Sequence, residues 1–386
     1  MTDNTHKALL PAGLHDVLPL DAAHEAAMVE RLMAEFARHG YDRVKPPMIE
    51  FEASLLSGPG AAMATQTFRL MDPISQQMLA IRPDITLQVA RIATSRLVNE
   101  PRPLRLSYAG QVLRVKGSQL RPERQFGQVG VELIGAFQPT ADAEAVLLAV
   151  RALQSLGVPN ISVDLNVPTL VPTVCRALGL PDEETFHLRQ ALDRRDAAGV
   201  AAVGGTAAGL LAQLMAASGP APRALAALAG LDLPDAATAD RNRLTEVVRL
   251  IDAAAPDLMV TVDLVEFRGF EYQTGLSFTL FSRGVRGELG RGGRYRAGGN
   301  GGGITEGEPS TGFTLYLDTV LRAVPGPDPV PRLFVPVEVA ASEGDRLRTE
   351  GWVTVGGLEP ADDPMAEARR LRCTHLFIGG QTVPVA

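Results

Sequence analysis

Residues 125–134 (QFGQVGVELI) carry the polar side chains that are best spaced to bind a small ligand. The alternation of apolar and polar residues predicts a β-strand, in which every second side chain lies on the same face. Gln128, Gly130 and Glu132 then share one face, so an amide and a carboxylate flank a position without a side chain. This spacing leaves a gap that suits a small polar ligand. The alternative interpretation is a solvent-facing strand with a glycine bulge.

Positive charge precedes this strand. Arg114 ends the segment QVLR, and a guanidinium that projects from a sheet suits a phosphate or a carboxylate. Residues 102–124 contain six cationic side chains and one acidic side chain, a net charge of +5, in a chain whose net charge is −7. We therefore expect a local anion-binding patch in this region, or a surface for a protein partner.

Two further segments combine polar side chains with a constrained backbone. In IRPDIT (81–86), Asp84 and Thr86 place a carboxylate and a hydroxyl at the start of a predicted helix, where Asp by itself is a common N-cap. RGFEYQTG (268–275) concentrates five polar side chains around two glycines, which is more typical of a site than of a plain loop. No GxxxxGK[ST] motif is present, and GRGGRY (290–295) lacks the strand–turn–helix setting of a dinucleotide site.

Composition argues against several classes of protein. A hydrophobic fraction of 46% and a charged fraction of 21% are typical of a globular protein, and the negative net charge argues against general binding to nucleic acid. Cys175 and Cys373 are far apart and the six histidines are scattered, so we expect no metal, no disulfide framework and no cofactor. With no export signal and no apolar run of the ~20 residues that span a bilayer, we expect a cytoplasmic protein without membrane attachment.

The elements that position these side chains predict an α+β fold built on an antiparallel sheet flanked by helices. A first helix is expected to have Asp21 as its cap and to end at Gly40, and a second is expected to begin at Asp84. The apolar residues of GFTLYLDTVL (312–321) predict a buried helix entered through Gly312. Strands are expected at 44–51, 68–71, 78–82, 104–115, 125–134, 261–265 and 276–281.

The distribution of residue types predicts two domains. Residues 1–325 are expected to form the core, discontinuous in sequence because an alanine- and leucine-rich helical insertion occupies about 165–260. PGPDPVP (325–331) is typical of a linker, and residues 331–386 predict a small α/β domain.

In their order along the chain, these segments resemble class II aminoacyl-tRNA synthetases, specifically the histidyl-tRNA synthetase family, over about residues 11–320. No single motif would be specific, but the ordered set is. The matching segments are GLHDVLP (13–19), YDRVKPPMIE (41–50) for motif 1, IRPDIT, GQVLRV with RQFGQVGVE (124–132) for motif 2, RGFEYQTG for the histidine-specific motif, GRGGRY, and GFTLYLDTVL for motif 3.

This chain differs from the synthetase family at positions that bind ATP in synthetases. The helix of motif 3 carries an arginine for the ATP γ-phosphate in synthetases; Thr319 stands there, and Arg322 lies about one turn (~4.5 Å) farther along the helix. Lys116 stands where motif 2 has a glutamate, two residues after Arg114. Because preorganised cations stabilise the transferring phosphate, these departures imply a loss of synthetase chemistry. Residues 331–386, with six arginines and eight acidic residues, resemble a truncated anticodon-binding domain that is unsuited to tRNA.

The amino-acid pocket of the family is better preserved. The resemblance implies that Asp84 and Thr86 hold the amino group of histidine, while Gln273 replaces a tyrosine near the imidazole. The full set of histidine-binding residues that it implies is Asp84, Thr86, Arg114, Gln128, Glu132, Arg268, Tyr272 and Gln273.

This pattern resembles the regulatory subunits of ATP phosphoribosyltransferase, a synthetase-like family without catalytic activity of its own. The resemblance implies that the short catalytic subunit is the partner, in the first step of histidine biosynthesis, and that histidine acts through feedback inhibition. It also implies a hetero-octamer built on a dimer of this chain, with Pro47 at the dimer interface, and no binding of tRNA. The alternatives are an active histidyl-tRNA synthetase with a divergent motif 3 and a stand-alone paralogue that binds an amino acid or modifies another macromolecule.

Overall fold

The computed structural model describes residues 9–117, 121–202, 204–266, 273–298, 307–327 and 330–385. The chain separates into two compact units, Met1–Pro325 and Gly326–Ala386. No helix in the described ranges is long and apolar enough to cross a membrane.

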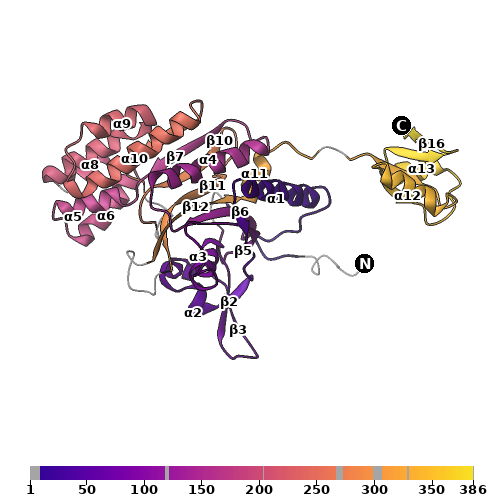
Figure 1. Ribbon diagram of the computed structural model, residues 1–386, viewed down its shortest axis with the longest axis horizontal. Coiled ribbons are helices and arrows are strands. Elements are labelled where there is room, and N and C mark those ends of the chain that lie inside the picture. Colours follow the sequence, from indigo (N-terminus) through magenta and orange to yellow (C-terminus); the bar gives the residue numbers. More distant parts are fainter. Residues whose placement is uncertain are drawn as a thin grey trace. The chain divides into compact units, whose positions relative to one another are not determined.

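A nine-stranded sheet forms the centre of the first unit (Figure 1). Six neighbouring strands pair antiparallel in the order β5, β6, β12, β11, β10 and β7, which agrees with the predicted α+β class. The sheet is mixed at its margins, because β1 pairs parallel with β5 and β9 pairs parallel with β7. The strands are β1 (Asp42–Arg43), β5 (Leu104–Leu113), β6 (Gln125–Ile134), β7 (Ile161–Asn166), β8 (Gly219–Pro220), β9 (Met259–Asp263), β10 (Ser277–Ser282), β11 (Gly290–Ala297) and β12 (Glu308–Tyr316).

Helices cover both faces of this sheet. Figure 1 shows α1 (Asp21–Arg38) and α4 (Pro139–Ser155) on one face and α3 (Thr86–Ser95) on the other. On the α1 face the alternate apolar residues of the strands are buried, and Phe36 of α1 meets Phe313 of β12 edge to face with ring centroids 5.6 Å apart. The α3 face carries a separate core, so both faces of the central strands are shielded from water.

A three-stranded antiparallel sheet lies beside α3. It contains the predicted hairpin, now β3 (Arg69–Met71) and β4 (Met78–Ile81), with β2 (Ile49–Phe51) on the other side of β4. The predicted strand over 44–51 is interrupted, because Pro46 and Pro47 have no N–H to donate to a ladder. Their carbonyl oxygens instead accept hydrogen bonds, that of Pro46 from the Arg82 side chain and that of Pro47 from the Gln88 side chain of α3. Two short helices follow β2, α2 (Glu52–Leu55) and the 3₁₀ helix η2 (Gly58–Gln66).

The alanine- and leucine-rich region, predicted to be helical over about 165–260, has two strands that the composition did not predict, β7 at its start and the short β8 inside it. β7 is a strand of the central sheet, and its sequence ISVDLN has the period-two alternation of a strand within a helical stretch. Between β7 and β9 the described chain is mainly helical, as α5 (Leu170–Ala177), α6 (Asp182–Asp193), α7 (Ala197–Ala202), α8 (Gly205–Ala217), α9 (Ala221–Ala229) and α10 (Asp235–Ala254).

The prediction of a buried helix over residues 312–321 is wrong for its first half. Residues up to Tyr316 belong to β12, and the helix α11 is only Leu317–Ala323. Phe313, Leu315 and Leu317 are two residues apart, and this is the period of a strand with one face in the core. β12 pairs along its length with β6 and β11, which satisfies the backbone groups that a helix would have bonded internally.

Two predicted helix caps also differ. Asp21 is the first residue of α1 rather than its cap, and there it places negative charge near the positive end of the helix dipole. α3 begins at Thr86 after Ile85, yet Asp84 Oδ1 still accepts a hydrogen bond from the Thr86 N–H at 2.9 Å. Gly40 follows the end of α1 with a φ of +79°, as predicted for a glycine that ends a helix.

The C-terminal unit is a small α/β fold with its own core. Its four strands pair in the order β14, β13, β15, β16, and its apolar clusters consist only of residues of this unit. Asp363 caps the last helix through hydrogen bonds from two backbone N–H groups. The elements are β13 (Arg332–Val335), α12 (Ala341–Thr349), β14 (Val353–Gly356), α13 (Pro364–Arg370), β15 (His375–Ile378) and β16 (Gln381–Pro384).

Candidate functional site

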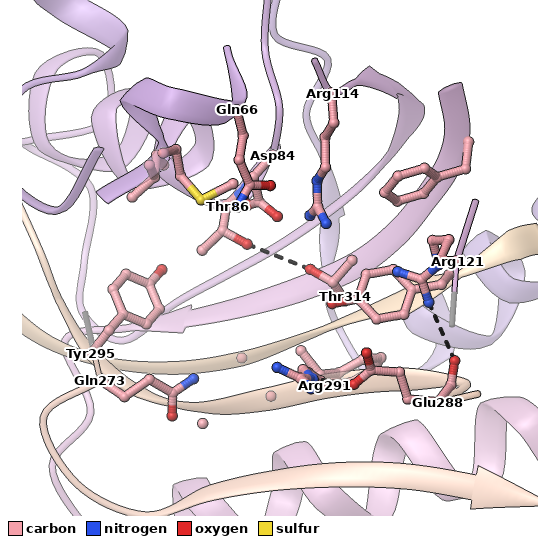
Figure 2. Close-up of a pocket in the computed structure, with 18 of the residues that line it drawn as sticks. Gln66, Asp84, Thr86, Arg114, Arg121, Gln273, Glu288, Arg291, Tyr295 and Thr314 are labelled. Atoms are coloured by element: carbon pink, nitrogen blue, oxygen red, sulfur yellow. Dashed lines mark hydrogen bonds and ion pairs between the residues drawn. The ribbon is translucent and has the colours of Figure 1, made fainter. Parts of the chain in front are cut away.

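A pocket of about 440 Å³ opens on the α3 face of the central sheet (Figure 2). Five of the eight predicted histidine-binding residues line it: Asp84, Thr86, Arg114, Glu132 and Gln273. Gln128 is fully buried and lies behind this lining. The other two, Arg268 and Tyr272, lie outside the described residues.

Strand register brings the floor of the pocket together. Glu132 of β6 pairs with Gly312 of β12, and Gly130 pairs with both Thr314 of β12 and Tyr108 of β5. A side chain at position 312 would overlap the Glu132 carboxylate, so only glycine permits that carboxylate to lie over β12. The polar residues of three strands thereby share one face.

The gap predicted above Gly130 is filled by the protein itself. A Cβ at position 130 would come within 2.6 Å of the Tyr108 hydroxyl, so the phenol occupies the space that was expected to hold a ligand. The alternative of a solvent-facing strand is also wrong, because nine of the ten residues of β6 are buried and its pairing with β5 and β12 is regular. Sequence analysis did not identify Tyr108, because its position over Gly130 depends on the register between β5 and β6.

Gln128 positions Asp84 rather than contacting the cavity. Its Nε2 donates to Asp84 Oδ2 at 2.9 Å, and its Oε1 accepts from the Ile85 N–H at 3.1 Å. With the bond from the Thr86 N–H, both carboxylate oxygens of Asp84 are held at the pocket wall. This arrangement keeps Asp84 ready to accept a hydrogen bond from a cationic ligand group.

A chain of hydroxyls connects Thr86, the first residue of α3, to Glu132. Tyr108 Oη lies 2.6 Å from Thr314 Oγ1 and 3.1 Å from Thr86 Oγ1, and it donates to Glu132 Oε1 at 3.3 Å. Burial, together with the negative charge of Asp84, raises the pKa of Glu132 to about 8, although hydrogen bonds from neighbouring hydroxyls oppose the shift. Burial likewise raises the pKa of Tyr108 well above its ordinary value. Glu132 is therefore mostly protonated at neutral pH in the empty pocket.

The predicted anion patch over residues 102–124 divides into two parts. Arg102 and Arg105 form ion pairs with Glu308 and Glu144 and do not line the pocket. Arg124 also lies outside the pocket lining and donates to the carbonyl oxygens of Arg114 and Ala12. The cations that line the pocket are Arg114, Lys116 and Arg121 from this region and Arg291 from β11. The patch is therefore not one surface, because a net charge counted along the chain ignores where the strands place each side chain.

Arg121 and Arg291 both form ion pairs with acidic side chains. Arg121 Nε lies 3.1 Å from Asp318 Oδ2, and Arg291 forms an ion pair with Glu288. Figure 2 shows Arg121, Arg291 and Glu288 on the side of the pocket opposite Asp84 and Thr86. Sequence analysis assigned no role to Asp318 or Glu288. It matched GRGGRY to a motif of the family but did not predict the strand β11 that carries Arg291.

Thr319 is buried in α11, and both Arg121 and Arg322 donate to its hydroxyl. Arg322 is directed towards Asp318 and does not line the pocket. The helix of motif 3 thus adds no cation to the cavity. Across the described residues, no three His, Cys, Asp or Glu side chains are grouped as a metal site would require.

Comparison with known proteins identifies the family. A sequence model of the histidyl-tRNA synthetase family matches residues 13–320. The ATP phosphoribosyltransferase regulatory subunit of Rhodospirillum centenum is 67% identical over 97% of this chain and 95% of its own length. Those of Paramagnetospirillum magneticum and Gluconobacter oxydans are 60% and 46% identical, each over at least 97% of both chains. The chain belongs to the family of ATP phosphoribosyltransferase regulatory subunits.

Two solved structures have the same fold as this member of the regulatory-subunit family. An ATP phosphoribosyltransferase regulatory subunit/histidyl-tRNA synthetase from Bacillus halodurans superposes with a TM-score of 0.81 at 23% identity, over 94% of this chain and 96% of that one. Histidyl-tRNA synthetase from a Nostoc species gives a TM-score of 0.79 at 17% identity, over 98% and 97%. The predicted family and the predicted class II synthetase-like fold are confirmed.

Proposed function

We propose that this chain is the non-catalytic regulatory subunit of an ATP phosphoribosyltransferase. It activates the short catalytic subunit in the first step of histidine biosynthesis, and it binds histidine as the feedback inhibitor. The observation that carries this proposal is the identity of 46–67% to regulatory subunits over nearly the whole length of both chains.

The chemistry of the pocket supports histidine as its ligand. Asp84 offers an oriented carboxylate to an α-ammonium group, and Arg114 offers a guanidinium to an α-carboxylate. Gln273 Oε1 is a buried acceptor without a hydrogen-bond donor in the described part of the chain, and it suits an imidazole N–H. Arg268 and Tyr272 remain part of the proposed binding set.

The part of the pocket where a synthetase would bind ATP supports a non-catalytic role. Thr319 replaces the arginine expected in motif 3, and Arg322 is directed to Asp318 instead. A synthetase needs preorganised cations on the triphosphate, and α11 supplies none. An active histidyl-tRNA synthetase is therefore the second candidate function. The shared fold is what favours it.

A reconstitution assay tests the proposal. The purified chain is added to the short catalytic subunit, and the formation of phosphoribosyl-ATP is measured with and without histidine, beside an ATP–pyrophosphate exchange assay of the chain alone. We expect stimulation of the transferase, inhibition by histidine and no exchange. A transferase that is not stimulated would sink the proposal, and histidine-dependent exchange would favour the synthetase.

The assembly is a further part of the proposal. We propose a dimer of this chain within a hetero-octamer, in the cytoplasm, without tRNA. The net charge of −2 over residues 331–386 supports the exclusion of tRNA. Exposed apolar side chains of the small sheet that follows Pro47 support the dimer: Ile49, Phe51 and Leu70 lie on one face by their strand register.

A further inference from the structure

The side of the pocket opposite Asp84 contains an aromatic slot that is already occupied. The guanidinium carbon of Arg121 lies 3.7 Å from the ring centroid of Tyr316 and 5.0 Å from that of Phe126. The two rings, 6.0 Å apart and edge to face, both line the pocket. A planar cation thus covers the aromatic surface on which a planar ligand would otherwise stack.

Arg121 is held in this slot from several elements. Its Nε donates to Asp318 Oδ2 at 3.1 Å, and its Nη2 lies 3.5 Å from Thr319 Oγ1. Figure 2 shows its contact with Glu288, where Nη2 lies 3.4 Å from the carbonyl oxygen. The side chains of Arg121 and Asp318 are only 10% and 11% exposed, so water screens this ion pair less than a surface pair. The slot is therefore closed by a well-anchored side chain.

The charges around the cavity give only a weak attraction for a polyanion. Its lining carries four cationic and four acidic side chains, and because Glu132 is mostly protonated the net charge is 4 − 3 = +1. Arg291, which would face a phosphate, is paired with Glu288. A triphosphate would have to displace these internal carboxylates before it gained a cation.

We propose that Arg121, anchored by Asp318, is an internal plug that excludes nucleotides and makes the pocket selective for a ligand of amino-acid size. The inference rests on the proposed function, because the catalytic partner works in the presence of ATP. If the pocket also bound ATP, its occupancy would depend on the concentration of the substrate ATP as well as on that of the end product histidine. Arg121 and Asp318 are thus specificity-determining residues of the sensor site.

The test removes the plug without leaving a buried charge. In Arg121→Ala/Asp318→Asn, the slot opens and no carboxylate remains uncompensated. Isothermal titration with adenosine, which carries a planar base and no charge, measures the opening directly. We expect adenosine binding to tighten roughly tenfold or more relative to the unmodified chain, the gain expected when one base stacks on aromatic rings. Histidine affinity should stay within about twofold, since neither residue contacts the proposed amino-acid end.

Arg322→Ala is the matched control, because Arg322 also contacts Asp318 and Thr319 but lies outside the pocket lining. It should gain no affinity for adenosine. A double variant that binds histidine normally and gains no affinity for adenosine overturns the proposal. A comparable gain in Arg322→Ala also overturns it.

A second measurement needs no variant. The histidine titration of the unmodified chain is repeated with MgATP at millimolar concentration, and the apparent affinity should not change. Competition by MgATP would overturn the plug. If the unmodified chain binds no histidine, the proposed function fails, whereas a gain of adenosine binding in the double variant still supports the plug.

Discussion

At the scale of single residues, Glu132 is a buried carboxyl group whose charge we expect to change when a cationic ligand binds in the pocket. Its pKa of about 8 results from burial, and nearby Asp84 adds to the shift. An ammonium group bound between these two carboxyl groups favours the ionised form of Glu132 and lowers that pKa. Ligand binding and proton release are then coupled.

We predict that histidine binding between pH 7 and 8 releases a proton to the buffer. The free pocket holds a proton on Glu132 below its pKa of about 8, and the occupied pocket does not, so affinity rises with pH and levels off above that value. Titration calorimetry in buffers of different ionisation enthalpy measures the number of protons. Glu132→Gln is the control for protons from histidine itself, and equal release in this variant would contradict the assignment.

At the scale of elements, the site depends on the close approach of three strands. β6 lies between β5 and β12, and Gly130 is the position where the Tyr108 ring crosses over it. A second link joins the helical region to the sheet, because fully buried Asp142 of α4 pairs with Arg294 of β11 and Arg243 of α10. Breaking such a buried pair by removing one partner is costly, so this network holds β11 in place beside the pocket.

We predict that Gly130→Ala lowers the free energy of unfolding by about 1–3 kcal/mol, the typical cost of overpacking a core. The added methyl group would meet the Tyr108 ring and the backbone of β12. Chemical denaturation measures this change. Gly209→Ala in α8 is the opposite case, because nothing lies within 4 Å of the new Cβ. That variant should be stabilised by up to about 1 kcal/mol through helix propensity. Equal effects at both positions would contradict the crossing of Tyr108 over β6.

At the scale of the whole molecule, the two units have separate cores. Among the residues that the structure describes, the apolar clusters of the first unit contain none beyond Val324, and those of the second contain none before Leu333. Each unit therefore has the buried apolar surface that drives folding within its own boundaries.

We predict that a chain ending at Pro325 folds and binds histidine as the full chain does. Thermal unfolding followed by circular dichroism and histidine titration measure the two properties. A truncated chain that unfolds without cooperativity would contradict the independence of the first unit. The same truncated chain in the reconstitution assay shows whether Gly326–Ala386 is needed for activation of the catalytic subunit.

We predict that Phe51→Glu converts the proposed dimer to a monomer, because a charge on the apolar face of the small sheet cannot be desolvated at an interface. Phe51 is 45% exposed in the single chain. Light scattering after size exclusion measures the mass. Met259→Glu on β9, also an exposed apolar position, is the matched control and should leave the mass unchanged. A Phe51→Glu chain that keeps the mass of a dimer would place the interface elsewhere.

The sequence by itself determined the features that are encoded locally. Period-two alternation predicted β6, residue patterns with turn signals predicted β5 and the β3–β4 hairpin, and the order of motifs indicated the family and five of the residues that line the pocket. Only the tertiary structure decided that β12 continues through Tyr316, that Tyr108 fills the gap over Gly130, and that Gln128 lies behind Asp84. It also decided the pairing of Arg121 with Asp318. These features join residues distant in sequence, and strand register and side-chain packing determine which of them meet.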